Sequence, residues 1–175
     1  MSRKKSPSDS SAAVPAARRL PMREFSRSLP MSLLRAREAV MRQFRPSLRN
    51  HGLTEQQWRI LRALTAVEAI EITELARMAF LLGPSLSRIL RDLEARQLVE
   101  RKTAEVDQRR AVVSISVKGL KLIEAVAPTS EAIYAEITRR FGARRLSELQ
   151  EMLAVLESSL AGLGAPDSTD ESDPD

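Results

Sequence analysis

Hydroxyl and guanidinium side chains cluster just after Gly83, and both groups bond phosphates and bases. Ser85, Ser87, Arg88 and Arg91 fall within the segment GPSLSRILRDL. Serine hydroxyls and helix N-termini bond phosphate oxygens, and arginine pairs bidentately with guanine O6 and N7 in the major groove. These residue types predict contact with nucleic acid, provided that one helix face presents them together.

The apolar residues of the same segment indicate such a helix. Leu86, Ile89, Leu90 and Leu93 recur at the i, i+3, i+4, i+7 spacing of a buried helix face. The opposite face then turns outward, and it is narrow enough to enter a major groove. The alternative is a solvated surface helix whose Arg91 pairs with nearby acids. The outward residues are Pro84, Ser87, Arg88, Arg91 and Ala95.

A hairpin with a basic tip is predicted directly after this helix. Two strand-like runs flank a charged loop that contains Asp107, Arg109 and Arg110. Arginines at such a tip can reach a narrow minor groove, where the potential is strongly negative. Asp107 either holds a guanidinium by charge-assisted hydrogen bonds or forms the turn, and the sequence leaves both roles open. The helix and hairpin together predict a winged helix-turn-helix.

The preceding elements complete that motif. We expect Thr73 to cap a short helix, TELARMAF, and the chain to turn tightly at Leu82–Gly83. Pro84 suits the first position of the next helix. A helix, a short turn and a second helix form a helix-turn-helix, although such pairs also occur as plain structure.

Long helices are expected on both sides of this motif. One should run over about 30–50, and a second, over 54–66, begins with a capping box between Thr54 and Gln57. Ser116 should cap a helix that Gly142 ends, with a kink at Pro128 or a restart near Thr129. A last helix should cover 143–160. Their apolar stripes exceed what one small domain can cover, which predicts a homodimer.

The composition excludes several classes of function. The chain of 175 residues has no cysteine and one histidine, so disulfides, thiolate chemistry and a multi-histidine metal site within one chain are excluded. We expect no cofactor, and no convincing catalytic set is present, so an enzyme is the weakest interpretation. No apolar run suggests a membrane span or secretory signal, which favours a cytoplasmic protein.

The net charge of +5 is unevenly distributed. Residues 1–30 carry +5 and residues 161–175 carry −5, which leaves +5 on the ordered centre. Basic charge there suits a polyanion, but many unrelated proteins are equally basic. Both ends lack apolar periodicity, so we expect a disordered basic extension over 1–28 and a disordered acidic tail over 164–175.

The chain also resembles the MarR family of transcriptional regulators. The resemblance rests on the order of elements, on SRILRDLE (87–94), and on Asp107-x-Arg109 followed by Ile115-Ser116-x-x-Gly119. Within the family, LLRAREAVMRQFRP and LTEQQWRILRAL are most similar to regulators of homoprotocatechuate (hydroxyphenylacetate) degradation operons. Gln97 stands where many members have glycine, Pro128 interrupts a helix that is usually continuous, and the N-terminal extension lies outside the family pattern.

The resemblance implies a mainly α fold with a small β-hairpin. The winged-helix domain would span 29–163, with the DNA-binding part at 53–116 and dimerisation helices at 29–51 and 117–160. It also implies a homodimeric repressor that binds double-stranded DNA at a palindromic operator. A small aromatic carboxylate, hydroxyphenylacetate-like or hydroxynicotinate-like, would release it.

Four residues are candidates for binding that effector. Arg37 interrupts the apolar stripe of the first helix, where a charge is costly unless it is paired. Its partner is either an internal carboxylate or the carboxylate of a ligand beneath apolar walls. Phe44, His51 and Trp58 could supply the walls and a polar handle, although His51 may simply end a helix and Trp58 may pack beside the helix cap.

The sequence supports three hypotheses about function. The first is the ligand-responsive repressor, and the second is a nonspecific or architectural DNA-binding protein without an effector. The third is a protein-interaction module that no longer contacts DNA. Competition by unrelated DNA separates the first two, because nonspecific binding shows little preference for any site.

Overall fold

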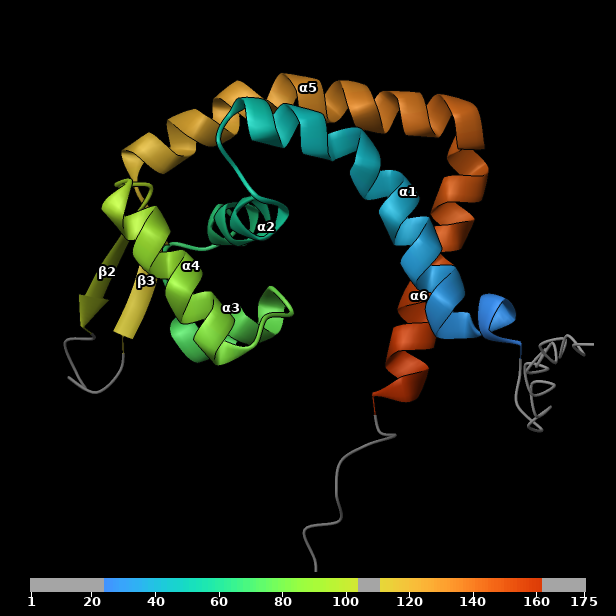
Figure 1. Cartoon of the computed structure of the whole chain (residues 1–175), viewed down its shortest axis with the longest axis horizontal. Coiled ribbons are helices and arrows are strands. Elements are labelled where there is room, and N and C mark those ends of the chain that lie inside the picture. Colours follow the sequence, from blue (N-terminus) through green and yellow to red (C-terminus); the bar gives the residue numbers. More distant parts are fainter. Residues whose placement is uncertain (1–23, 104–110, 162–175) are drawn as a thin grey trace, which may run out of the picture. The chain divides into compact units, whose positions relative to one another are not determined.

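The structure, a computed structural model, describes residues 24–103 and 111–161 (Figure 1). This part of the chain is mainly helical with one small antiparallel sheet, which confirms the predicted fold class. Its elements, in chain order, are η1 (Phe25–Arg27), α1 (Leu29–Asn50), α2 (Glu55–Leu64), β1 (Ile70–Glu71), α3 (Ile72–Met78), α4 (Gly83–Ala95), β2 (Val99–Thr103), β3 (Ala111–Ile115), α5 (Val117–Phe141) and α6 (Ala143–Leu160).

The chain divides into two compact units, Met1–Val40 and Met41–Asp175. The first contains η1 and the beginning of α1, where Leu33, Leu34 and Val40 are exposed to solvent. The second contains the end of α1, the sheet and helices α2 to α6. Most of the buried side chains therefore belong to the second unit.

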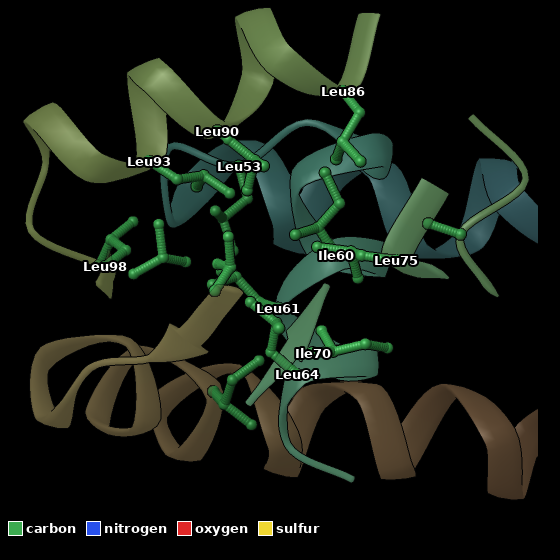
Figure 2. Packing of buried hydrophobic residues seen from close by; sticks show 14 of the residues in the cluster. Leu53, Ile60, Leu61, Leu64, Ile70, Leu75, Leu86, Leu90, Leu93 and Leu98 are labelled. Carbon is green, nitrogen blue, oxygen red and sulfur yellow. The ribbon is translucent and has the colours of Figure 1, made fainter. Parts of the chain in front are cut away.

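The core of the second unit forms around α2, which contacts α3, α4, α5 and β3. Figure 2 shows leucines of α4 directed inward toward Leu53, Ile60 and Leu61. Burying such a side chain fully stabilises a fold by about 1.5–3 kcal/mol. This core therefore holds α4 firmly against the rest of the domain. Its buried members are Phe44, Leu48, Leu53, Ile60, Leu61, Leu64, Ile70, Leu75, Ala79, Leu86, Leu90, Leu93, Leu98, Val99, Val113, Ile123 and Val126.

Local capping sets the helix starts that the sequence predicts most sharply. The Thr54 hydroxyl accepts the Gln57 amide at 3.2 Å, and Gln57 Oε1 accepts the Thr54 amide at 2.8 Å. This confirms the capping box of α2, which ends at Leu64 rather than near Ala66. Ser116 caps α5 by accepting the Gly119 amide at 3.0 Å, also as predicted.

The start of α3 differs from the prediction. Its N-cap is Glu71, which makes no side-chain capping bond, and Thr73 lies inside the first turn. The reason is a third strand: Ile70 and Glu71 pair with Val113 and Val112, so the chain enters the helix directly from the sheet. The sheet order is β1-β3-β2, and the sequence predicted only the β2–β3 hairpin.

α5 is one continuous helix, so the predicted restart near Thr129 is wrong. Pro128 lacks the amide hydrogen that would bond the carbonyl of Glu124. Pro128 itself is exposed, whereas Val126 and Ser130 on either side are buried. Packing of these neighbours holds the helical path through the proline, and Gly142, at φ 95°, ends the helix as predicted.

Candidate nucleic-acid interface

α4 has the two faces that its sequence predicts. Leu86, Leu90 and Leu93 are at most 1% exposed, and Ile89 is half-buried against the core. On the opposite face Pro84, Ser85, Arg88 and Arg91 are exposed, and Ser87 is half-buried. The helix begins at Gly83, which places Pro84 at its second position rather than its first.

Polar bonds fix the orientation of this helix. Gln57 Nε2 of α2 donates to Asp92 Oδ2 at 2.6 Å, while the guanidinium of Arg96 lies 3.6 Å from the same carboxylate oxygen. Because Gln57 also closes the capping box, the start of α2 and the last turns of α4 form one bonded unit. Arg91 Nε donates a long bond of 3.5 Å to the Ser87 carbonyl of its own helix.

The wing is described only at its base. β2 and β3 are antiparallel, with Val99 opposite Ile115 and Thr103 opposite Ala111. Asp107, Arg109 and Arg110 lie outside the described residues, so their predicted roles remain predictions. Thr73 is exposed in the first turn of α3, which leaves its hydroxyl accessible although it caps no helix.

A tight junction joins α4, β2 and α5. Gln97 has φ 60°, in the left-handed region that favours glycine, which explains why glycine suits this position. The Ser116 hydroxyl donates to the Gln97 carbonyl at 2.7 Å. A Cβ at Gly119 would lie 2.2 Å from the Leu98 carbonyl oxygen, so only glycine lets α5 approach this closely.

The candidate effector residues lie in both units. Arg37 belongs to the first unit, is exposed, and forms an ion pair with Glu38 at 3.0 Å. A carboxylate of the protein itself is therefore one partner of this guanidinium. Phe44, His51 and Trp58 belong to the second unit.

Two of these residues have aromatic or cationic neighbours that the sequence did not single out. The ring of Phe44 lies 5.0 Å from that of Tyr134 on α5, tilted by 59°. The guanidinium of Arg62 lies 5.9 Å from the ring of Trp58, within the range of a cation–π contact. Arg62 could have been identified from the sequence, because residues four positions apart in a helix, such as Trp58 and Arg62, lie on the same face.

His51 and Ser47 contribute polar groups nearby in the chain. His51 Nδ1 lies 2.8 Å from the Ser47 carbonyl, so the ring of this turn residue bonds the last turn of α1. The Ser47 hydroxyl is buried and, among the described residues, has no hydrogen-bond partner. An unsatisfied buried hydroxyl is uncommon and is a potential handle for a ligand.

The described residues contain no cluster of three or more histidine, cysteine or acidic side chains that could hold a metal ion. No helix in this part of the chain is long and apolar enough to cross a membrane.

Known proteins provide an independent comparison. The MarR family model matches residues 51–110. The homoprotocatechuate degradative operon repressor of Escherichia coli is 39% identical over 126 residues, which cover 72% of this chain and 85% of the repressor.

Two solved structures share the fold over most of their length. NadR in complex with 4-hydroxyphenylacetate is 36% identical, with a TM-score of 0.68, covering 78% of this chain and 97% of NadR. The repressor CouR bound to a 23-mer DNA duplex is 27% identical, with a TM-score of 0.70 and the same coverage of 78% and 97%. The relatives are transcriptional regulators and not enzymes. This chain therefore belongs to the MarR family of DNA-binding transcriptional repressors.

Proposed function

We propose that the protein is a homodimeric repressor that binds a palindromic operator and releases it on binding a small aromatic carboxylic acid. The observation that carries the proposal is the outward face of α4, which presents serines and guanidiniums on a rigidly packed helix. Arg88 and Arg91 read guanine edges in the major groove, and Ser85, Ser87 and the helix start at Pro84 contact phosphates or bases.

The remaining DNA contacts come from the wing and from α3. Arg109 and Arg110 enter the minor groove, and Asp107 orients one of their guanidiniums. The exposed Thr73 hydroxyl bonds a phosphate oxygen. Phosphate contacts of this kind position the protein, whereas the base contacts of α4 supply specificity.

Substitutions on α4 test the DNA-binding face. We expect Arg88→Ala and Arg91→Ala each to weaken binding to a duplex selected from random sequences by about 5- to 100-fold. Fluorescence anisotropy at fixed salt, with unrelated DNA as competitor, measures the loss. Lys121→Ala on α5 is the control because it removes one exposed cation elsewhere.

Two outcomes contradict this part of the proposal. If the α4 variants bind the selected duplex as well as the wild type, α4 is not the reading helix. If unrelated DNA competes equally with the selected duplex, the protein binds nonspecifically and fits the architectural alternative.

The exposed apolar side chains of the long helices support the dimer. No residue of α6 is buried in the single chain, although Met152 and Val155 are large and apolar with more than 60% of their surface exposed. A second chain would cover such side chains. A two-fold dimer presents two reading heads, so its operator should be palindromic.

An aromatic acid as effector is supported by the residues of the second unit and by the relatives. Phe44, Tyr134 and Trp58 are aromatic, and Arg62 places a cation beside Trp58 that can pair with a carboxylate. NadR holds 4-hydroxyphenylacetate, and a repressor of homoprotocatechuate degradation is 39% identical. The regulated genes would therefore degrade an aromatic compound, and the protein would act in the cytoplasm.

Calorimetry distinguishes the two candidate cations for that carboxylate. Phenylacetates, nicotinates and benzoates are titrated into the wild type and into the Arg37→Ala and Arg62→Ala variants. Truncating the arginine that pairs with the ligand should weaken binding of the acid by about 10-fold or more. Equal binding by a variant removes that arginine from the site, and an acid that binds without releasing DNA is not the effector.

A further inference from the structure

The segment between α3 and α4 presents apolar side chains to solvent. Phe80 and Leu82 are each 79% exposed, and Met78 is 43% exposed, whereas the residues between them, Ala79 and Leu81, pack inward. We call Met78, Phe80 and Leu82 the turn surface. Its side chains alternate with core residues, so their exposure follows from the path of the backbone.

The backbone of this turn is held in a costly conformation. Phe80 has φ 50°, in the left-handed region, which costs a residue with a side chain on the order of 1 kcal/mol. The Leu81 amide bonds the Ala76 carbonyl at 2.9 Å, and the Phe80 amide bonds the Arg77 carbonyl at 3.1 Å. These bonds form the common helix-ending motif in which the left-handed residue is usually glycine.

A side chain of α2 braces the same turn. Arg59 Nη1 donates to the Ala79 carbonyl at 2.8 Å, at the peptide that precedes Phe80. Arg59 Nη2 also lies 3.3 Å from Glu55, and the other oxygen of Glu55 bonds Arg45 of α1 at 3.2 Å. Arg59 is therefore a positioning residue that ties the turn to α1 and α2. This brace fixes the peptide that precedes Phe80.

The turn surface continues into the proposed reading face of α4. Leu82 is the N-cap of α4 and forms no side-chain capping bond, although this position usually favours serine, threonine, aspartate or asparagine. The N-terminal residues of a recognition helix are those that contact base edges. The exposed cations Arg77 and Arg88 flank the turn in sequence, which suits a polyanion with apolar features.

We propose that Phe80 and Leu82 contact thymine methyl groups of the operator and so extend the base-reading surface beyond α4. The thymine C5-methyl is the apolar group that the major groove displays, and apolar side chains recognise it. The proposal rests on the proposed function, because it requires α4 to lie in that groove. It assigns the turn surface a part in sequence specificity.

Uracil substitution tests the contact directly, because uracil pairs as thymine does and lacks only the methyl group. The probe is a duplex that the wild type selects from a random library, with each thymine replaced in turn by uracil. We expect one or two positions per half-site at which uracil weakens wild-type binding by about 3- to 5-fold. Phe80→Ala or Leu82→Ala should weaken binding to the thymine duplex by a similar factor and lose sensitivity to uracil at those positions.

Matched variants separate this contact from a general effect. Phe25→Ala is the control, because Phe25 is 74% exposed in η1 and lies outside both the DNA-binding part and the expected dimerisation helices. It should keep the wild-type affinity and uracil sensitivity. Arg59→Gln keeps the side chains of Phe80 and Leu82 but removes the bond that positions their turn, so it should reduce the discrimination between thymine and uracil more than the affinity for unrelated DNA.

Several results would overturn the inference. The proposal fails if Phe80→Ala and Leu82→Ala keep the full uracil sensitivity of the wild type. It also fails if both variants weaken binding to all duplexes equally, because that pattern indicates a lost contact to the sugar-phosphate backbone rather than to a base. If Arg88→Ala and Arg91→Ala leave binding unchanged, the proposed function has failed. If those two variants lose affinity and the turn variants do not, only this inference has failed.

Discussion

A single residue at the junction after α4 adopts a backbone conformation that usually favours glycine. Gln97 occupies a left-handed conformation at φ 60° and is exposed, so its side chain contributes little to the core. Its carbonyl nevertheless accepts the Ser116 hydroxyl at 2.7 Å, which locks the turn. This conformation therefore costs the folded protein free energy that a glycine at the same position would avoid.

This strain leads to a stability prediction. Gln97→Gly should raise the free energy of unfolding by about 0.5–1 kcal/mol, because relief of left-handed strain outweighs the greater entropy of the unfolded glycine. Urea unfolding followed by circular dichroism measures the change. Gln97→Ala keeps the strain and should gain nothing, and a destabilised glycine variant would contradict the account.

At the scale of elements, the spacing between α5 and the end of α4 depends on one small residue. Gly119 lies in the first turn of α5, where its missing side chain leaves room for the Leu98 carbonyl. The Ser116 amide donates to that same carbonyl at 3.1 Å. The contact thus joins the winged part of the domain to the long helix that follows.

Gly119→Ala should therefore be strongly destabilising. Its Cβ would meet a backbone oxygen at 2.2 Å, and relief requires the backbone to move, at a cost of about 2 kcal/mol or more. Thermal unfolding checks this, with Gly83→Ala as the control because a Cβ there meets no atom within 4 Å. Equal melting temperatures for the two variants would contradict this prediction, because they would show that the backbone near Leu98 moves aside at little cost.

At the scale of the whole molecule, the apolar surface of α6 determines the expected assembly. Leu153 is 40% exposed in the single chain, and α6 contributes no buried residue to the core. A helix with such a stripe is stable when a second surface covers it. The fold of the second unit should therefore survive changes on α6 that prevent assembly.

Leu153→Glu should convert the protein to a monomer, because burying an unpaired carboxylate in an apolar interface is costly. Sedimentation analysis measures the mass, and operator affinity should fall with it because one head replaces two. Ser158→Glu adds the same charge at an exposed position outside the apolar stripe and should leave the dimer intact. A dimeric Leu153→Glu variant would exclude this stripe as the interface.

The sequence by itself determined the long helices, the caps of α2 and α5, and the outward face of α4. Thr54, Ser116 and the α4 leucines act through residues three or four positions away, so their roles follow from local spacing. The same local reasoning misplaced the start of α3 and predicted either a kink at Pro128 or a restart near Thr129, of which the restart is wrong. At both positions tertiary packing overrode the local preference. Strand pairing of Ile70 with Val113 sets the start of α3, and burial of Val126 and Ser130 holds α5 helical through Pro128.

Only the tertiary structure decided which residues contact distant parts of the chain and which lie in a strained backbone conformation. Arg59 reaches the Ala79 carbonyl across 20 positions of sequence, and the ring of Phe44 on α1 lies 5.0 Å from that of Tyr134 on α5. Phe80 is an ordinary apolar residue in the sequence, and its exposure at φ 50° follows from the path between two packed helices. Contacts that close long loops depend on how the whole chain packs, and no local period encodes them.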